Sequence, residues 1–396
     1  MKVICDRAGL LDAVNLVAAV VPVRSPSPQL SCVRLEASKG KAGSDLHLTG
    51  TDAETSLQFS LAQCDAQKAG LVVVPAEKLR QIIQATDTDP TLTLESDSDA
   101  CLITGANSRF KVFGYPASDF PKTLPFAEAL AQDKPRTTFV HSAGGLLGLI
   151  HRTSFATARE SSRYAINGVL LRRDGKKLEM AATDGRRLAL ARTTVKSAAS
   201  TESSPSSCII PSKALNLFTR LALDPEEGVR VAITERRVYF AFGVDITGKD
   251  EARAPRAVLS SALVEGTFPP YEDVIPKDQD KKAVIARDAF AGAVRRAAIL
   301  TNEESRGVRM AFSGKSKRLK ISSRAPEMGE AEIEVDLTSF DGDDIEISFN
   351  PAFIVDALKV MDQEQVTFEL KASNKPGLMR SESDFVYVVM PVNLPT

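Results

Sequence analysis

Residues 73–86 read VVPAEKLRQIIQAT, residues 209–222 read IIPSKALNLFTRLA and residues 348–361 read SFNPAFIVDALKVM. In each stretch an extended segment meets a proline, and apolar residues then recur at steps of three and four. Proline suits the first turn of a helix, because the N–H that it lacks has no helical partner there. Each stretch therefore predicts a strand that leads into an amphipathic helix. The three prolines lie 136 and 140 residues apart, which indicates an internal threefold repeat.

Two further sets of segments recur at a similar spacing. Helical periodicity runs through residues 7–21, 142–153 and 287–300. Alternating apolar residues predict strands in LHLTGTDAETSL (46–57) and LEMAATDGRRLAL (178–190), which carry an equivalent Thr-Asp pair; RLKISSRAPE (318–327) is the third copy without that pair. Two helices and several short strands per copy predict an α+β fold rather than alternating βαβ units.

Three copies of this length fill the chain. Turn-forming and charged residues collect at 121–135 and 269–282, which predicts domains at 1–128, 136–272 and 281–396. The serine-rich stretch 193–207 predicts a solvated loop, and 38–44 is a similar insert.

Composition excludes several classes of protein. The 396 residues carry 50 Lys plus Arg against 51 Asp plus Glu, a net charge of −1, so any contact with a polyanion must be local. Three histidines and five cysteines without a C-x-x-C pair argue against a metal site and suit a reducing compartment. No run of about 18 apolar residues exists, so we expect a cytoplasmic protein with no membrane contact.

Catalytic motifs are absent from the sequence. Residues 143–148 (AGGLLG) lack the Lys-Ser/Thr of a phosphate loop, and no serine has a G-x-S-x-G setting. Asp52 and Asp184 are the candidate acid/base residues, but repetition places them in different copies, and a Thr-Asp pair that ends a strand usually forms a turn. We therefore expect no enzymatic activity, no catalytic residues, no metal and no cofactor. A hydrolase that uses Asp52 or Asp184 is the rival hypothesis, and a duplicated interaction scaffold is a third.

Basic residues on the predicted helices are the local electrostatic feature. Collected on one face by repetition, they would form a positive lining, while the acidic stretches 329–336 and 341–344 keep the whole chain near neutral. The basic residues concerned are Arg24, Lys78, Arg80, His151, Arg152, Arg159, Arg163, Lys213, Arg220, Arg295, Arg296, Arg306 and Lys359.

Several strings, in order along the chain, resemble the bacterial sliding clamp, the beta subunit of the replicative DNA polymerase III. They are SRYAING (162–168), ATDGRRLA (182–189), FPPY (268–271), RAAILTNE (296–303) with RGV (306–308), and YVVMP (387–391). The resemblance covers essentially the whole chain. It implies three tandem copies of a DNA-clamp domain, with helices inside and antiparallel sheets outside.

In this resemblance two chains close head to tail into a ring around double-stranded DNA, held without regard to DNA sequence. Such a processivity factor tethers the catalytic subunit of the replicative polymerase and other proteins with a clamp-binding motif, and a clamp loader places it on DNA. The implied homodimer interface sets Phe110 against Ile299 and Leu300. Lys78, Arg109 and Lys111 would face Glu330, Glu332 and Glu334 at its rim.

The resemblance also implies two sets of binding residues. The residues that it implies for contact with DNA are Arg24, Arg159, Arg163, Tyr164 and Lys213. A groove between copies two and three would take peptides of the Gln-Leu-x-Leu-Phe type, and its residues are Ile166, Thr183, Gly185, Arg187, Leu188, Pro269, Val274, Asn350, Phe353, Val388, Val389, Met390, Pro391 and Val392. Departures from the family pattern, which bear on DNA contact and on peptide preference, are Glu77, Ala165, Asp273, Ser305, Asn393 and the Pro395-Thr396 tail.

Overall fold

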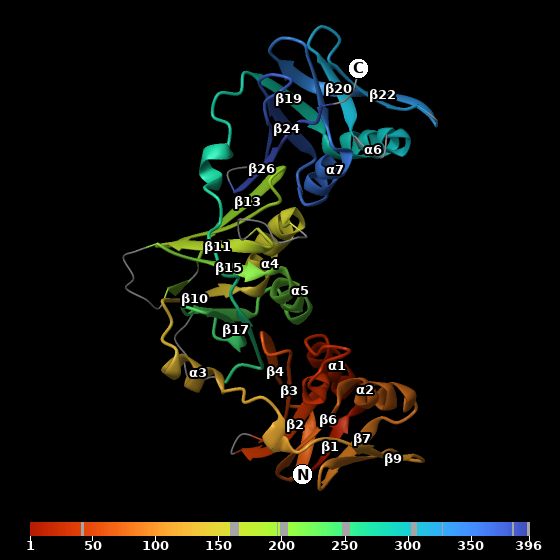
Figure 1. Cartoon of the computed structure of the whole chain (residues 1–396), viewed down its shortest axis with the longest axis vertical. Coiled ribbons are helices and arrows are strands. Elements are labelled where there is room, and N and C mark those ends of the chain that lie inside the picture. Colours follow the sequence, from red (N-terminus) through yellow and green to blue (C-terminus); the bar gives the residue numbers. More distant parts are fainter. Residues whose placement is uncertain are drawn as a thin grey trace. The chain divides into compact units, whose positions relative to one another are not determined.

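The computed structural model describes residues 1–40, 43–158, 166–195, 197–198, 205–247, 254–301, 307–326, 328–381 and 384–393 (Figure 1). The chain forms two compact units. The first comprises Met1–Leu147, Val195–Ser206 and Lys213–Leu263, and the second comprises Gly148–Thr194, Ser207–Ser212 and Val264–Thr396.

The first unit holds two antiparallel sheets. In spatial order, the 5-stranded sheet contains β5 (Cys64–Lys68), β1 (Lys2–Asp6), β7 (Thr91–Asp97), β8 (Ala100–Thr104) and β9 (Arg109–Phe113). The 9-stranded sheet contains β14 (Ser197–Ala198), β10 (Thr137–Ser142), β16 (Gly228–Ile233), β17 (Arg237–Val244), β18 (Ala257–Ala262), β4 (Thr55–Leu61), β3 (Gly43–Thr51), β2 (Cys32–Gly40) and β6 (Gly70–Pro75).

The second unit is built on a 12-stranded sheet. Its order is β15 (Ser206–Pro211), β11 (Gly168–Asp174), β12 (Lys177–Thr183), β13 (Arg187–Thr194), β26 (Phe385–Val389), β25 (Gly377–Ser381), β24 (Gln365–Leu370), β19 (Lys281–Ala286), β22 (Gly329–Asp341), β21 (Arg318–Ala325), β20 (Val308–Ser313) and β23 (Ile345–Phe349). From β11 to β23 in this order, each pair of neighbouring strands is antiparallel, as predicted.

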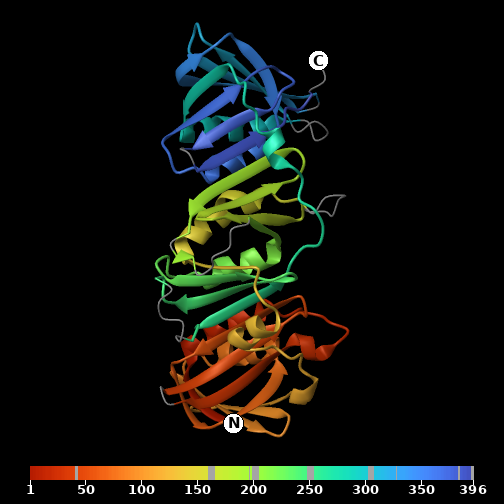
Figure 2. The same cartoon turned by 90° about the vertical axis from the view of Figure 1, so that its left-hand side faces the viewer.

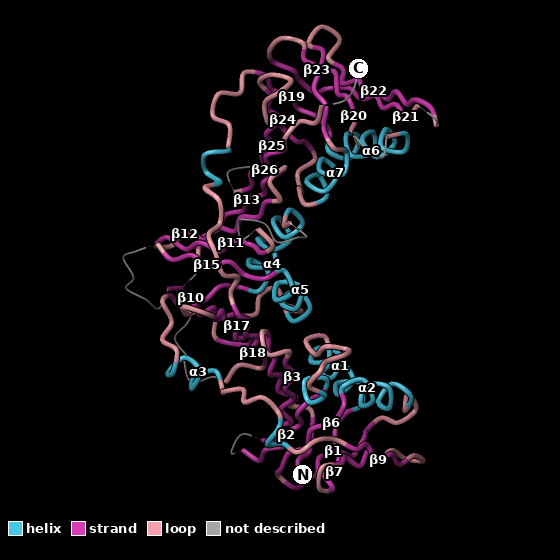
Figure 3. Tube along the Cα trace, viewed as in Figure 1, coloured by secondary structure: helices cyan, strands magenta, loops and turns pink. Residues whose placement is uncertain are grey.

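The predicted helices form where the repeat places them. The helices of the described residues are α1 (Arg7–Ala18), α2 (Ala76–Ala85), α3 (Phe126–Gln132), α4 (Ala143–Thr153), α5 (Ser212–Leu221), α6 (Arg287–Ala297) and α7 (Pro351–Lys359). In the first unit α1 packs beside α2, and in the second α6 packs beside α7 (Figure 3). Proline stands at the start of α2 and α7, as predicted. Pro75 is the N-cap residue of α2, and Pro351 is the first residue of α7, after Asn350, whose side chain accepts from the backbone N–H of Ala352 at 3.0 Å.

Two strand pairs join consecutive copies of the repeat. In the first joint, β4 of copy one pairs with β18 of copy two; in the second joint, β13 of copy two pairs with β26 of copy three. Each joint continues a sheet across a predicted domain boundary. The two compact units therefore do not coincide with the three copies, because backbone hydrogen bonds link each copy to the next.

Aromatic residues fill the core of each unit. In the second unit Phe368 contacts Phe290, Phe312 and Phe349, with ring centroids 5.4 to 6.3 Å apart. In the first unit Phe218 contacts Phe240 and Phe242 at 5.1 and 5.0 Å. These rings are almost completely buried, and burying such apolar area is the main favourable contribution to folding.

The structure adds one helix to the predicted linker 121–135. Helix α3 belongs to the first unit (Figure 2). Its Ala129 packs with Ala232 and Tyr239, and its Phe126 ring lies 6.2 Å from that of Tyr239. A seven-residue helix is too short to be stable alone, so these tertiary contacts hold it in place. Of the predicted serine-rich loop, residues 196 and 199–204 lie outside the described residues, and strands β13, β14 and β15 occupy most of the rest.

Candidate functional site

The two Thr-Asp pairs each form a turn, and the two turns are of the same type. The Asp52 carboxylate accepts from the backbone N–H groups of Glu54 and Thr55 at 3.0 and 2.6 Å, and the Thr51 hydroxyl donates to the carbonyl of Thr55 at 3.0 Å. The turn prediction is confirmed for copy one: both polar side chains cap backbone groups.

Copy two repeats these bonds residue by residue. Asp184 accepts from the N–H groups of Arg186 and Arg187 at 3.0 and 3.1 Å, and Thr183 donates to the carbonyl of Arg187 at 2.6 Å. The residue after the aspartate has a left-handed backbone in both turns, with φ of +80° at Ala53 and +83° at Gly185. Glycine adopts that conformation freely, whereas alanine is strained in it.

The Arg187 side chain, at the second joint, has three hydrogen-bond partners. Its guanidinium donates to Asp184 and to Asp356, both at 3.0 Å, and to the carbonyl of Phe155 at 2.8 Å. It also lies over the ring of Phe353, 4.4 Å from the centroid. Only 10% of the side chain is exposed. Through these contacts Arg187 links β13 to α7.

Tyr387, on β26, contacts the same two phenylalanines as Arg187. Its hydroxyl donates to the carbonyl of Phe353 at 2.8 Å, and its ring lies 5.8 Å from that of Phe155. Burial raises the pKa of the Tyr387 phenol well above its usual value, although the neighbouring Arg187 guanidinium lowers it in part. The phenol therefore stays protonated and acts as a fixed hydrogen-bond donor.

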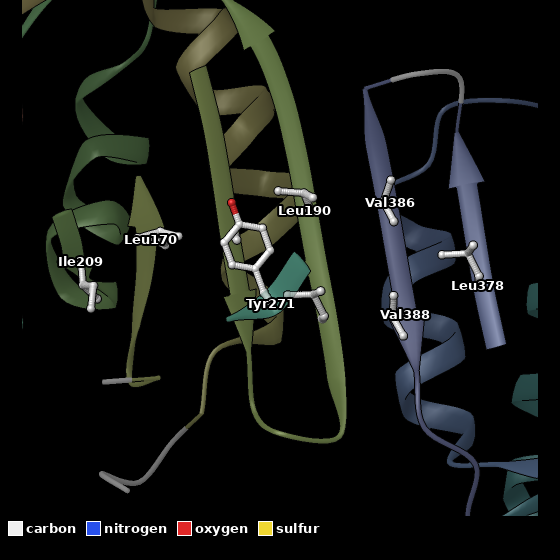
Figure 4. Packing of buried hydrophobic residues seen from close by; sticks show 9 residues of the cluster. Leu170, Leu190, Ile209, Tyr271, Leu378, Val386 and Val388 are labelled. Atoms are coloured by element: carbon white, nitrogen blue, oxygen red, sulfur yellow. The ribbon is translucent and has the colours of Figure 1, made fainter. Parts of the chain in front are cut away.

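An apolar cluster lies across the second joint (Figure 4). Its strands are far apart in the sequence, with Leu188 and Leu190 on β13 opposite Val388 and Val386 on β26. Tyr271, in the 3₁₀ turn η4 (Tyr271–Val274), also belongs to the cluster. The remaining members are Leu170, Ala181, Ile209 and Leu378, with Val264, Phe268 and Ile275 packed against them.

The predicted groove residues separate into a buried, a partly exposed and an exposed set. The buried set is Ile166, Thr183, Leu188, Val388 and Val389. Val274 and Met390 are 52% and 41% exposed, and Gly185 is exposed as well. The partly exposed members are Arg187, Pro269, Asn350, Phe353, Pro391 and Val392. The structure brings Arg187 together with Phe353, and Leu188 with Val388; Val389 is completely buried and supports the sheet from within.

The predicted interface residues lie on the units as follows. Phe110 is half-buried on β9, and its neighbour Phe113 is 77% exposed. Ile299 and Leu300 form the turn η5 (Ala298–Leu300) after α6, and Ile299 is 74% exposed.

Four of the six predicted rim charges form ion pairs within the chain. Glu330 pairs with Arg324 at 3.1 Å, Glu332 with Lys320 at 2.6 Å, and Glu334 with Arg318 across β21 and β22. On β9, Lys111 pairs with Asp97 at 2.7 Å. An ion pair between two copies would therefore have to exchange one of these bonds.

Of the predicted DNA contacts, the structure describes Arg24 and Lys213. Arg24 is exposed in the loop after α1. Lys213, in the first turn of α5, pairs with Asp52 and donates to the carbonyl of Val20 at 3.2 Å. Arg159, Arg163 and Tyr164 lie outside the described residues, as do Ala165, Ser305, Arg306 and the Pro395-Thr396 tail.

The structure offers no support for the hydrolase hypothesis. Asp52 and Asp184 belong to different units, and each carboxylate is committed to its own turn. No group of three or more His, Cys, Asp or Glu residues in the described part of the chain is arranged to hold a metal ion. In that same part, no helix combines the length and the apolar character that crossing a membrane requires.

Sequence reasoning missed several residues of the second joint. Asp356, Phe155 and Tyr387 position Arg187, yet Asp356 is 169 residues away from it in the chain. No local pattern marks such a partner. Phe268, Tyr271 and Tyr387 do occur in the strings FPPY and YVVMP, which was the signal available for them.

Comparison with known proteins identifies the family. Three family models match in order: the N-terminal domain of the DNA polymerase III beta subunit at residues 1–125, its central domain at 143–270 and its C-terminal domain at 272–393. The chain belongs to the DNA polymerase III beta subunit family, the beta sliding clamps.

Individual beta sliding clamps match over their full length. The beta sliding clamp of Pseudomonas putida is 34% identical over 391 residues, which are 98% of this chain and 99% of the relative. That of Escherichia coli is 30% identical over 397 residues, 100% of each chain. The crystal structure of the DNA polymerase III subunit beta from Pseudomonas aeruginosa superimposes with a TM-score of 0.87 at 34% identity, covering 100% of both chains.

The family assignment confirms the main predictions from sequence. The chain has three clamp domains with antiparallel sheets, and it acts in DNA replication as the non-catalytic processivity factor of DNA polymerase III. DNA and the polymerase are accordingly the partners of a beta sliding clamp.

The matched turns generate a paired prediction about stability. Ala53→Gly relieves a strained left-handed residue, so we expect the free energy of unfolding to rise by up to about 1 kcal/mol. Gly185→Ala introduces the same strain and should lower the free energy of unfolding by about 1 kcal/mol. Urea unfolding of both variants measures the two effects, and changes of equal sign would contradict the equivalence of the turns.

Proposed function

We propose that two copies of this chain associate head to tail into a closed ring around duplex DNA, and that partners bind through a peptide groove at the second joint. Family membership supports the sliding function, and two unpaired strand edges support the closure. A closed ring cannot leave DNA sideways, so a polymerase tethered to it stays on the template even when the ring itself holds DNA weakly.

One unpaired edge belongs to β9 in the first unit. This strand is last in its sheet, and β8 is its ladder partner among the described residues. Its outer face carries Arg109, Lys111 and Phe113. An edge strand with a free row of N–H and C=O groups is a template for pairing with another chain.

The other unpaired edge belongs to the first half of β22 in the second unit. Residues 329–336 pair with β21 on one side, whereas β19 pairs only with residues 337–341 further along. The free side belongs to a stretch that carries Glu330, Glu332 and Glu334, opposite in charge to β9. Leu300 lies beside the start of this stretch, 3.8 Å from a β-carbon placed on Gly329.

These two edges are different surfaces of one chain, so their association is heterologous. Ile299 and Phe113 supply exposed apolar area to it, and the charge pattern favours one orientation. Because the exposed ion pairs already exist within each chain, we assign most of the affinity to backbone pairing and apolar burial rather than to new ion pairs.

Contact with DNA is proposed to be weak and directed at phosphates. Arg24 is exposed and could contact a phosphate, whereas Lys213 already forms an ion pair with Asp52. Arg295 and Arg296 are exposed at the end of α6, where the structure describes no ion pair for either. Few phosphate contacts leave the ring free to slide and make binding sensitive to salt.

The second joint is proposed to take an extended peptide of the Gln-Leu-x-Leu-Phe type. Val274, Met390, Phe353 and Pro269 would contact the peptide, and Leu188 and Val388 would form the apolar base beneath it. Burying a Leu and a Phe contributes about 1.5–3 kcal/mol each, and ordering the peptide offsets much of that, which predicts affinity near micromolar. Such affinity permits exchange between the polymerase, a clamp loader and other partners.

The strand-edge interface predicts a monomeric variant. Ile299→Asp places a charge on apolar area that the second copy would bury, so light scattering should report the mass of one chain instead of two. Leu223→Asp is the matched control, because Leu223 is as exposed as Ile299 and belongs to neither edge strand. A wild-type chain that stays monomeric at high concentration would exclude the ring.

The groove predicts a selective loss of peptide binding. Met390→Ala removes an exposed apolar side chain and should weaken a Gln-Leu-Ser-Leu-Phe peptide by about three- to tenfold in a fluorescence anisotropy titration. Met328→Ala, which changes a methionine 63% exposed at the turn between β21 and β22, should leave the affinity unchanged. Equal effects of the two substitutions would exclude the proposed groove.

Topological retention tests the function directly. Protein loaded on circular DNA by a clamp loader should stay bound through gel filtration and should be released when a nuclease cuts the circle. A scaffold that does not surround DNA would give equal retention on circular and linear molecules, and that outcome would refute the proposal.

A further inference from the structure

The first joint is the structural counterpart of the second, but its surface is polar. The turns align the two joints, because Asp52 accepts from the N–H of Thr55 as Asp184 accepts from that of Arg187. Counting from there, Leu188 and Leu190 correspond to Ser56 and Gln58. The strand registers then match their partners Val388 and Val386 to Ser260 and Val258.

Three of these four equivalent positions have therefore changed from apolar to polar. At the second joint all four residues belong to one apolar cluster. At the first joint the same four positions line a cavity of about 390 Å³ instead. This volume falls within the usual range for ligand sites, about 300–1,000 Å³.

The cavity lies within the first unit, between the sheet and the linker that carries α3. Leu124, Phe126 and Ala129 form its apolar wall. Gln58 holds the linker in place by donating from its side-chain amide to the carbonyl of Leu124 at 2.9 Å. The hydroxyls of Ser56 and Ser260 bond to each other at 2.8 Å on the opposite side.

The charges of the lining favour an anion. Arg237 and Lys122 line the cavity together with Asp133, so the charged side chains sum to +1. Arg237 donates to the carbonyl of Glu54 at 2.9 Å and to the hydroxyl of Ser260 at 3.2 Å, both from one nitrogen of its guanidinium. Within the described part of the chain, neither Arg237 nor Lys122 forms an ion pair with a carboxylate.

We propose that this cavity binds a peptide in which a carboxylate side chain stands next to an aliphatic one. The guanidinium of Arg237 receives the carboxylate, since its fork of donors matches the two oxygens. Lys122 adds a second positive charge. The aliphatic neighbour packs on Leu124 and Phe126, where it is shielded from water. The proposal does not depend on the groove at the second joint.

The test uses two labelled peptides and three variants of the full chain. The probes are acetylated, amidated Gly-Leu-Glu-Leu-Gly-Lys and the same peptide with Gln in place of Glu, each carrying an uncharged nitrobenzoxadiazole dye on the lysine amine. By fluorescence anisotropy we expect the Glu peptide to bind at least about fivefold more tightly, because it alone supplies a carboxylate. Arg237→Gln should weaken the Glu peptide about tenfold and abolish the difference between the two peptides.

Two further variants keep the proposal falsifiable if Arg237→Gln disturbs the fold. Lys122→Gln, which changes an exposed side chain, should weaken the Glu peptide several-fold. Lys134→Gln is the matched control, since Lys134 is exposed nearby but does not line the cavity, and it should change nothing.

Competition separates this site from the second joint. An unlabelled, amidated Gln-Leu-Ser-Leu-Phe peptide should not displace the Glu peptide. Equal affinity for the Glu and Gln probes would overturn the proposal, as would displacement by this competitor or binding of free glutarate without binding of the peptide.

Discussion

An antiparallel strand at the edge of a sheet leaves a row of N–H and C=O groups without partners, and this constraint organises the whole chain. Strand β4 of copy one and β13 of copy two would each be such an edge without the next copy. Strand β18 completes the edge at β4, and β26 completes the edge at β13, so the copies become continuous sheets. Among the edges that stay open are those at β9 and at the first half of β22. In the proposed ring, a second copy of the chain would supply the partner that each of these two edges lacks.

Repetition also explains how one architecture supports different surfaces. Both joints use the same Thr-Asp turn and the same strand pairing, but the side chains at the equivalent strand positions differ. The second joint is apolar around Leu188 and Val388, whereas the first is polar around Ser56 and Ser260. Backbone hydrogen bonds set the frame without regard to these side chains. The surfaces were therefore free to diverge while the fold stayed the same.

Local physics made much of this readable from the sequence. The helices α2, α5 and α7 follow from a proline and an apolar periodicity within one stretch, and the turns at Asp52 and Asp184 follow from the bonding habits of their own side chains. Contacts between residues far apart in the chain have no local sequence pattern that predicts them. The bonds of Arg187 to Asp356, and of Lys213 to Asp52, depend on how segments far apart in the sequence come together. Helix α3 was missed for the same reason, because contacts with Tyr239 rather than its own seven residues hold it.

Hydrogen exchange at the two free edges tests the central claim most directly. Amide exchange of β9 and of residues 329–336 in β22 should be measured at a protein concentration that favours two-chain particles and again after dilution to single chains. Pairing between copies predicts that both segments are protected at high concentration and lose that protection together on dilution, while the joint strands β18 and β26 stay protected throughout. Exchange at β9 and β22 that is fast at every concentration would contradict the account.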